Sequence, residues 1–169
     1  MAKIFFISEK TIKENTIVPD NLQSQMLQQA ITEAQEIYLQ EIIGTKMYNH
    51  YTELIANGDI SKPEYERYKY LLDEYLTPFL EYRVLTDLQI PLYSKNRNLG
   101  VVTTSDTNIS NVYFNDVQKI MQHYQNKAAF YATRISKYLC KHKNEFRDYD
   151  FCNCSGFGAR QTFYIPTVL

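Results

Sequence analysis

The chain has 169 residues and a net charge of −1, with 44% hydrophobic and 22% charged residues. This length suits one domain with a buried core, and the composition is that of a globular protein. No apolar run reaches the roughly 18 to 20 residues of a membrane span. The opening "MAKIFFISEK" lacks a long apolar run and a small-residue cleavage site, so we expect no signal peptide.

Residue usage gives three further indications. Three cysteines, an odd number, argue against a secreted disulfide framework and for a reducing interior. Fifteen tyrosines and no tryptophan suit half-buried seams and protein interfaces. Residues 1–60 carry four Lys/Arg against eight Asp/Glu, whereas residues 101–169 carry eight against five. These opposite-signed ends favour head-to-tail contacts between copies, and the profile is not that of a uniformly basic nucleic-acid-binding protein.

The first half of the chain predicts two helices after an irregular or briefly extended segment, residues 1–19. Asp20 or Asn21 can cap a helix that runs to about Ile43, and Gly44 ends it. A shorter helix follows, from Thr45 to Asn57-Gly58. The expected inward residues of the two helices are Leu22, Met26, Ala30, Ala34, Ile37, Leu39 and Ile42, then Met47, Tyr48, Tyr51, Leu54 and Ile55.

A third helix is predicted from Ser61 to about Leu88. Ser61 and Glu64 have the spacing of a capping box, and Pro63 in the first turn costs no hydrogen bond. Two apolar stripes indicate that this helix packs between others. Pro78 lies inside the pattern, so we expect it to kink the helix or divide it in two.

The second half predicts a long loop, residues 91–111, and a last helix, residues 112–143. Loops of this length are often functional or mobile. The helix has a heptad seam, for which two interpretations stay open: the core of the bundle, or a coiled coil with a separate partner. The seam residues are Phe114, Val117, Met121, Tyr124, Ala128, Tyr131, Ile135 and Tyr138.

Basic residues gather near the end of the last helix, at Arg134, Lys137, Lys141 and Lys143. Positive charge there complements the helix macrodipole. The alternative is that this cluster faces DNA or an acidic partner. Both interpretations stay open.

Few residues suggest a catalytic, metal-binding or phosphate-binding site. Cys140, His142, Cys152 and Cys154 are four potential zinc ligands, but their spacing lacks the usual gap within each pair, so free thiols are favoured. The glycines of "SGFGAR" lack the strand–loop–helix context of a phosphate loop. His50 and His123 have no nucleophile nearby in sequence, and carboxylate pairs such as Asp73-Glu74 suit solvated helix faces. We therefore expect no enzyme, no catalytic residue, no cofactor and no bound metal.

Three blocks carry a family resemblance: "AQEIYLQEIIGTKMYNHY", "YLLDEYLTPFLEYRVL" and "YQNKAAFYATRISKYLCKH", with "RNLGVV" between the last two. Together they resemble the small helical head–tail connector (adaptor) proteins of tailed bacteriophages, particularly forms from phages of Bacteroidetes, including the crAss-like group. The resemblance covers about residues 20–145. Its motifs are packing and turn residues.

The resemblance implies a structural virion protein without catalytic residue or cofactor. Such proteins bind beneath the portal at a capsid vertex, usually as a ring of twelve copies, and extend the DNA channel toward the tail. The implied partners are further copies of the chain, the portal protein, the next tail or ring protein, and genomic DNA that passes without sequence-specific binding. No membrane is implied. The loop residues Asn98, Gly100, Val101 and Val102 would reach the lumen or a neighbouring subunit.

The C-terminal residues 146–169 read as an extended, sticky arm with few charges. Burying its large apolar side chains contributes roughly 1.5–3 kcal/mol each. Ordering a flexible backbone costs about 1–2 kcal/mol per residue, so the arm needs a preformed acceptor surface. We expect it to order on assembly against a neighbouring subunit or the portal, and the alternative is an arm folded back on its own bundle. The contact residues would be Phe163, Tyr164, Ile165, Val168 and Leu169.

The sequence thus predicts an all-α fold: a small bundle of four to five helices, one kinked by proline, with a long loop and a C-terminal arm. The domain would span residues 20–145. The leading hypothesis is a connector subunit at the portal vertex of the virion, present in the host cytoplasm during assembly. The alternative is a helical protein–protein interaction or regulatory module without a virion role. A zinc-stapled binder or metal-dependent enzyme comes last.

Overall fold

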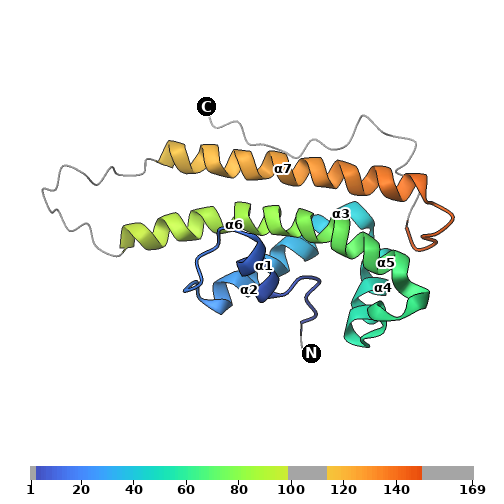
Figure 1. Cartoon of the computed structure of the whole chain (residues 1–169). Helices are drawn as coiled ribbons and strands as arrows, with labels where there is room; N and C mark the ends of the chain where they lie inside the picture. The colour runs from blue at the N-terminus through green and yellow to red at the C-terminus, as the bar shows by residue number, and fades with distance from the viewer. Residues whose placement is uncertain (1–2, 99–113, 150–169) are drawn as a thin grey trace, which may run out of the picture.

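The structure is a computed structural model that describes residues 3–98 and 114–149 (Figure 1). Within these ranges the fold is all-α and contains no strand, as the sequence predicts. Five continuous helical stretches are α1, α2–η1–α3, α4, α5–η4–α6 and α7. Their bounds are α1 Glu9–Asn15, α2 Ser24–Glu33, the π-helical turn η1 Ala34–Leu39, α3 Gln40–Ile43, α4 Thr45–Ala56, the 3-10 turns η2 Asp59–Ser61 and η3 Pro63–Tyr65, α5 Glu66–Leu71, the π-helical turn η4 Leu72–Leu76, α6 Thr77–Asn98 and α7 Phe114–Lys141.

The two longest helices, α6 and α7, form the main helix pair of the bundle. α6 and α7 run antiparallel along each other, and the shorter helices gather along α6 (Figure 1). α2 and η1 pack against α6, while α3 and η4 also contact α7. Since α6 has neighbours on more than one side, it carries the two apolar stripes that the sequence predicts.

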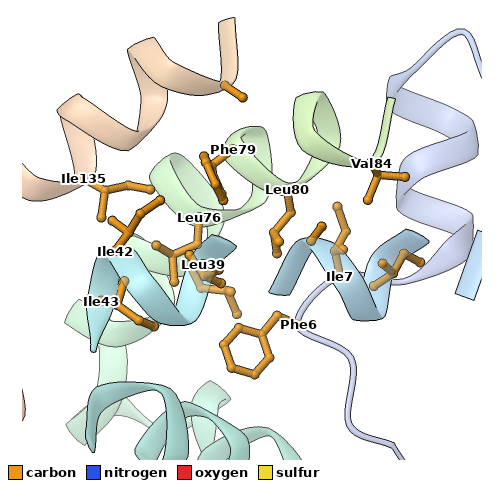
Figure 2. Packing of buried hydrophobic residues seen from close by; sticks show 14 of the residues in the cluster. Phe6, Ile7, Leu39, Ile42, Ile43, Leu76, Phe79, Leu80, Val84 and Ile135 are labelled. Carbon is orange, nitrogen blue, oxygen red and sulfur yellow. The ribbon is translucent and has the colours of Figure 1, made fainter. Parts of the chain in front are cut away.

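One hydrophobic core joins these layers (Figure 2). Leu76, Phe79 and Leu80 point from the η4–α6 stretch toward Leu39 of η1 and Ile135 of α7. All five side chains are buried, and complete burial of each contributes about 1.5–3 kcal/mol. The core therefore ties α7 to the N-terminal half of the chain.

The joint between α3 and α4 forms as predicted. Gly44 adopts φ 80° and ψ 154°, a backbone conformation that glycine adopts readily and that other residues disfavour because of their Cβ atom. α4 then starts at Thr45 and buries Met47, Tyr51 and Leu54. The spacing of the apolar residues and the glycine at the turn were together sufficient to predict this joint, because α4 is short and regular.

The heptad seam of α7 belongs to the bundle core. Ala128 and Ile135 are buried, and Tyr131 stacks on Tyr82 of α6 with ring centroids 5.7 Å apart. Tyr138 lies against Tyr75 at 4.6 Å. The intramolecular interpretation of the seam is therefore confirmed.

The N-terminal expectation is wrong. Residues 9–15 form α1, whose N-cap Ser8 accepts a hydrogen bond from the Thr11 amide and whose Ile12 is fully buried. The next helix starts at Ser24 with Gln23 at the N-cap position, not at Asp20 or Asn21. A single buried apolar residue in two turns leaves no period to detect, which is why the sequence did not reveal α1.

The π-helical turn η1 shifts the register of the following residues. Ile37 was expected inside, yet 57% of its surface is exposed. A π turn closes i→i+5 hydrogen bonds and holds an extra residue, so a face counted at 3.6 residues per turn rotates away from the core. Leu39 and Ile42 remain buried.

The start of the third predicted helix also differs. Ser61 and Glu64 form no capping box: Lys62 occupies the N-cap position without a side-chain bond, and α5 begins at Glu66. Pro63 does lie in the first turn of η3. Pro78, where we expected a kink or a break, lies in the first turn of α6, which directly follows the π-helical turn η4.

The loop expected at residues 91–111 begins later than predicted. α6 continues through Pro91 to Asn98, because Leu88 is buried and Leu92 still packs against the core. These contacts outweigh the hydrogen bond that a proline removes. The rest of the predicted loop lies outside the described residues.

The boundary of the C-terminal arm also moves. Residues 146–149 were assigned to the arm, but Phe146 and Tyr149 are buried in the bundle. The domain therefore extends through residue 149.

Candidate functional site

The outward face of α7 carries a basic stripe, which we define as Lys127, Phe130, Arg134, Lys137 and Lys141. These positions step by 3, 4, 3 and 4, so they follow one face of the helix. Phe130 lies between Lys127 and Arg134, and 60% of its surface is exposed. The face thus combines positive charge with an exposed aromatic ring.

Tyrosines of α7 itself and of the neighbouring η4–α6 stretch position part of this stripe. The Arg134 guanidinium lies 4.7 Å from the centroid of the Tyr75 ring and 5.7 Å from that of Tyr131. The Lys127 ammonium lies 5.0 Å from the Tyr82 ring. Cations over aromatic faces lose some mobility while their polar edges stay available to a partner. Phe130, Lys127 and Tyr82 also line a surface pocket.

Three of the four residues of the basic cluster predicted from the sequence lie on this stripe, and Lys143 follows the end of α7. Arg134, Lys137 and Lys141 are all exposed. Lys141 is in the last turn of α7, where it complements the helix dipole. Lys137 and Arg134 lie about one and two turns earlier, beyond the reach of that effect, so on α7 the dipole interpretation accounts for Lys141 alone.

A second surface has the opposite charge. We define the acidic ridge as Glu33, Glu36, Ile37 and Glu41, which follow the α2–η1–α3 stretch. Glu36, Ile37 and Glu41 are exposed and Glu33 is partly so. Among the described residues, no ion pair joins the ridge to the basic stripe. Sequence periodicity missed Ile37 as a surface residue, since nothing in the sequence announces the π turn.

A third feature anchors the segment that follows α7. Asp148 accepts hydrogen bonds at one carboxylate oxygen from the His50 ring nitrogen at 2.5 Å and from the Tyr68 hydroxyl at 3.2 Å. Its other oxygen lies 3.4 Å from the Lys46 ammonium. We call these four residues the Asp148 cluster. They join the C-terminal turn to α4 and α5.

The pKa values within this cluster follow from its contacts. Burial alone would raise the pKa of Asp148, but the contacts with His50, Lys46 and Tyr68 outweigh burial and lower it. Burial, and then the neighbouring Asp148 carboxylate, raises the pKa of Tyr68 to about 12. The cluster therefore favours an ionised aspartate beside a neutral tyrosine.

Aromatic rings support the same segment. Phe146 is fully buried, with its ring centroid 5.2 Å from that of Tyr68 and 6.0 Å from that of Tyr138. Edge-to-face contacts of this kind add to the gain from apolar burial. The point from which residues 150–169 continue is thus fixed on the bundle.

The next feature is the metal-binding capacity of the described part of the chain. It holds no group of three or more His, Cys, Asp or Glu able to bind a metal ion. Cys140 is disulfide-bonded, so the expectation of a free thiol is wrong at this position, and its sulfur is not available as a zinc ligand. Cys152 and Cys154 lie outside the described residues. None of the described helices is long and apolar enough to cross a membrane.

Comparison with known protein families identifies one family to which the chain belongs. A family described as a family of unknown function (DUF6712) matches residues 39–158, which is most of the chain. The chain belongs to the DUF6712 family. No curated protein and no solved structure matches it.

The DUF6712 match starts at Leu39, at the end of η1, and continues past Asp148. It therefore includes the joint at Gly44, the basic stripe and the Asp148 cluster. α1 and α2 precede it, as do three of the four residues of the acidic ridge. The part of this DUF6712 chain that matches the family is thus centred on the α6–α7 pair.

The remaining predicted site residues belong to the loop and to the arm. Asn98 is the last residue of α6. Gly100, Val101 and Val102 lie outside the described residues, and so do the predicted arm contacts Phe163, Tyr164, Ile165, Val168 and Leu169.

Proposed function

We propose that this chain is a structural virion protein: a subunit of the head–tail connector ring of a tailed bacteriophage, docked beneath the portal. It would extend the DNA channel toward the tail and act through assembly, without turnover. The first support is the sequence resemblance of three blocks to such connector proteins.

The observation that carries the proposal is how these blocks lie in the fold. The first block forms η1, α3 and the first part of α4. The second block forms the end of α5, all of η4 and the start of α6, and the third forms the C-terminal two thirds of α7. Phe79, Leu80 and Ile135 pack between them in one core. Residues far apart in the sequence that resemble one family thus build one shared framework.

The outer surface of this framework suits a protein with several neighbours. Large apolar side chains are exposed on η1, α6 and α7, at Ile37, Ile90, Ile120 and Phe130. Single exposed apolar residues are ordinary, but two of these lie within surfaces of opposite charge. Such a chain can meet a different neighbour on each side, as a ring subunit must.

A genetic experiment tests this function. In the phage that encodes the chain, deletion of its gene should give DNA-filled heads without attached tails, visible by electron microscopy. Expression of the chain from a plasmid should restore complete particles. Complete, infectious virions in the absence of the gene would contradict the proposal and favour an interaction module without a virion role.

A truncation extends the test to the predicted arm. A chain that ends at residue 149 keeps Phe146, Asp148 and Tyr149, and therefore keeps the anchored segment. We expect it to fold, as judged by helical circular dichroism, and to fail in complementation. Full complementation by this variant would show that residues 150–169 have no part in assembly.

A further inference from the structure

The basic stripe and the acidic ridge have matching layouts. Each has a large apolar side chain between charged neighbours, Phe130 in the stripe and Ile37 in the ridge, with 60% and 57% of its surface exposed. Charged residues lie on both sides of each centre. The two surfaces therefore carry opposite charge, and each has an exposed apolar residue between its charged residues.

The spacing of the charges also corresponds. Lys127 and Arg134 lie three residues before and four residues after Phe130. Glu33 and Glu41 lie four residues before and four residues after Ile37. On the regular helix α7, at about 1.5 Å of rise per residue, Lys127 and Arg134 lie roughly 4.5–6 Å along the helix from Phe130. Glu33 and Glu41 flank Ile37 on either side of the π-helical turn η1. If Ile37 of one copy packs on Phe130 of another, both flanking glutamates come opposite basic residues.

These features favour a second copy over nucleic acid as the occupant. A phosphate backbone would pair with the lysines and arginine, but it offers no partner for Phe130, and it leaves the acidic ridge unexplained. A second copy covers both apolar residues and pairs both sets of charges in one contact. The glutamates are also available, since Glu36 and Glu41 have no ion pair among the described residues.

We infer that the acidic ridge of one copy docks on the basic stripe of the next, with Ile37 packed against Phe130. This inference rests on the proposed function, for which it names the surfaces through which neighbouring subunits meet. The contact joins two different surfaces and can therefore repeat around a ring.

Charge reversal tests the inference with two variants. Arg134→Glu with Lys137→Glu makes the stripe acidic, and Glu36→Lys with Glu41→Lys makes the ridge basic. Like charges across the contact should weaken self-association of either variant about tenfold or more at low salt, measured by sedimentation velocity. In an equimolar mixture every ridge can meet a stripe of opposite charge, so association should return.

Three controls keep the result specific. Lys3→Glu with Lys69→Glu makes the same change in net charge as the stripe variant, at exposed positions outside both surfaces, and should leave association unchanged. Thermal melts by circular dichroism verify that each variant is folded. Phe130→Ala removes the apolar centre without changing charge, and should also weaken association.

The outcomes separate the inference from the function. Loss of association in each variant with recovery in the mixture supports the contact. Unchanged association in both variants overturns the inference and leaves the connector proposal standing. Loss without recovery in the mixture shows that the two surfaces do not meet each other and also overturns it. Normal association with weaker binding of a DNA duplex by the stripe variant would assign the stripe to nucleic acid instead. Charge-dependent association by a chain that does not bind the portal would support the contact and contradict the function.

Discussion

Replacement of Phe146 by alanine tests whether the segment after α7 belongs to the folded bundle. Phe146 is fully buried and contacts the rings of Tyr68 and Tyr138. Alanine removes most of this apolar surface and leaves a cavity between α5 and α7. Truncation of a buried phenylalanine costs about 3–5 kcal/mol.

We expect a value near the lower end, about 3 kcal/mol, because the segment follows the last helix and can partly collapse into the space. For a chain of this size, 1 kcal/mol corresponds to about 2–4 °C in melting temperature. The variant should therefore melt about 6–12 °C lower. Urea unfolding followed by circular dichroism at the helical band gives the free energy directly.

Phe130→Ala is the matched control, since the same side chain is removed from an exposed position on α7. Its unfolding free energy should change by about 0.5 kcal/mol or less. A cost below about 1 kcal/mol at Phe146 would refute the claim that residues 142–149 are anchored. A cost above about 2 kcal/mol at Phe130 would refute its placement on the surface.

Three further predictions concern stability and use urea unfolding. Gly44→Ala should cost about 1–3 kcal/mol of unfolding free energy through backbone strain alone, because an added Cβ meets no atom within 4 Å. Gly58→Asn should cost less, because Gly58 lies in the left-handed region that asparagine tolerates. Equal costs at the two glycines would contradict this argument. The folded state holds the Tyr68 proton more tightly than the unfolded state, so stability should be full below pH 10 and fall between pH 10 and 12; Tyr68→Phe should flatten this limb, and an unchanged slope would be inconsistent with the raised pKa. Asp87→Ala should lower the unfolding free energy by about 3 kcal/mol, because it leaves the mostly buried Arg83 guanidinium without its carboxylate partner. The double variant Asp87→Ala with Arg83→Met should recover most of that free energy. No recovery in the double variant would show that the ion pair itself is stabilising.

Local signals in the sequence were sufficient for part of the fold. The end of the second helical stretch at Gly44 and the seam of α7 were both predictable, since each depends on residues close in sequence. Long, strongly periodic helices place many residues on one face, so a single irregular position changes little.

The errors have tertiary causes. α6 continues through Pro91 because Leu88 and Leu92 pack on the core, and no local rule weighs that packing against a proline. Ile37 faces solvent because a π turn rotates it outward. α1 contributes only Ile12 to the core, and its neighbours supply the rest of its stabilisation.

The candidate site was less predictable than the fold. Arg134, Lys137 and Lys141 were recognised as a basic cluster from their sequence spacing. The acidic ridge and the Asp148 cluster were missed. His50 and Asp148 are 98 residues apart, and their contact depends on how the C-terminal turn packs against α4. No local pattern in the sequence encodes that proximity.

The most direct test of the central claim is native mass spectrometry of the purified chain mixed with the portal protein of the same phage. We predict one closed oligomer of the chain bound to the portal ring, with a single defined copy number. A chain that remains monomeric or dimeric and does not bind the portal would contradict the account.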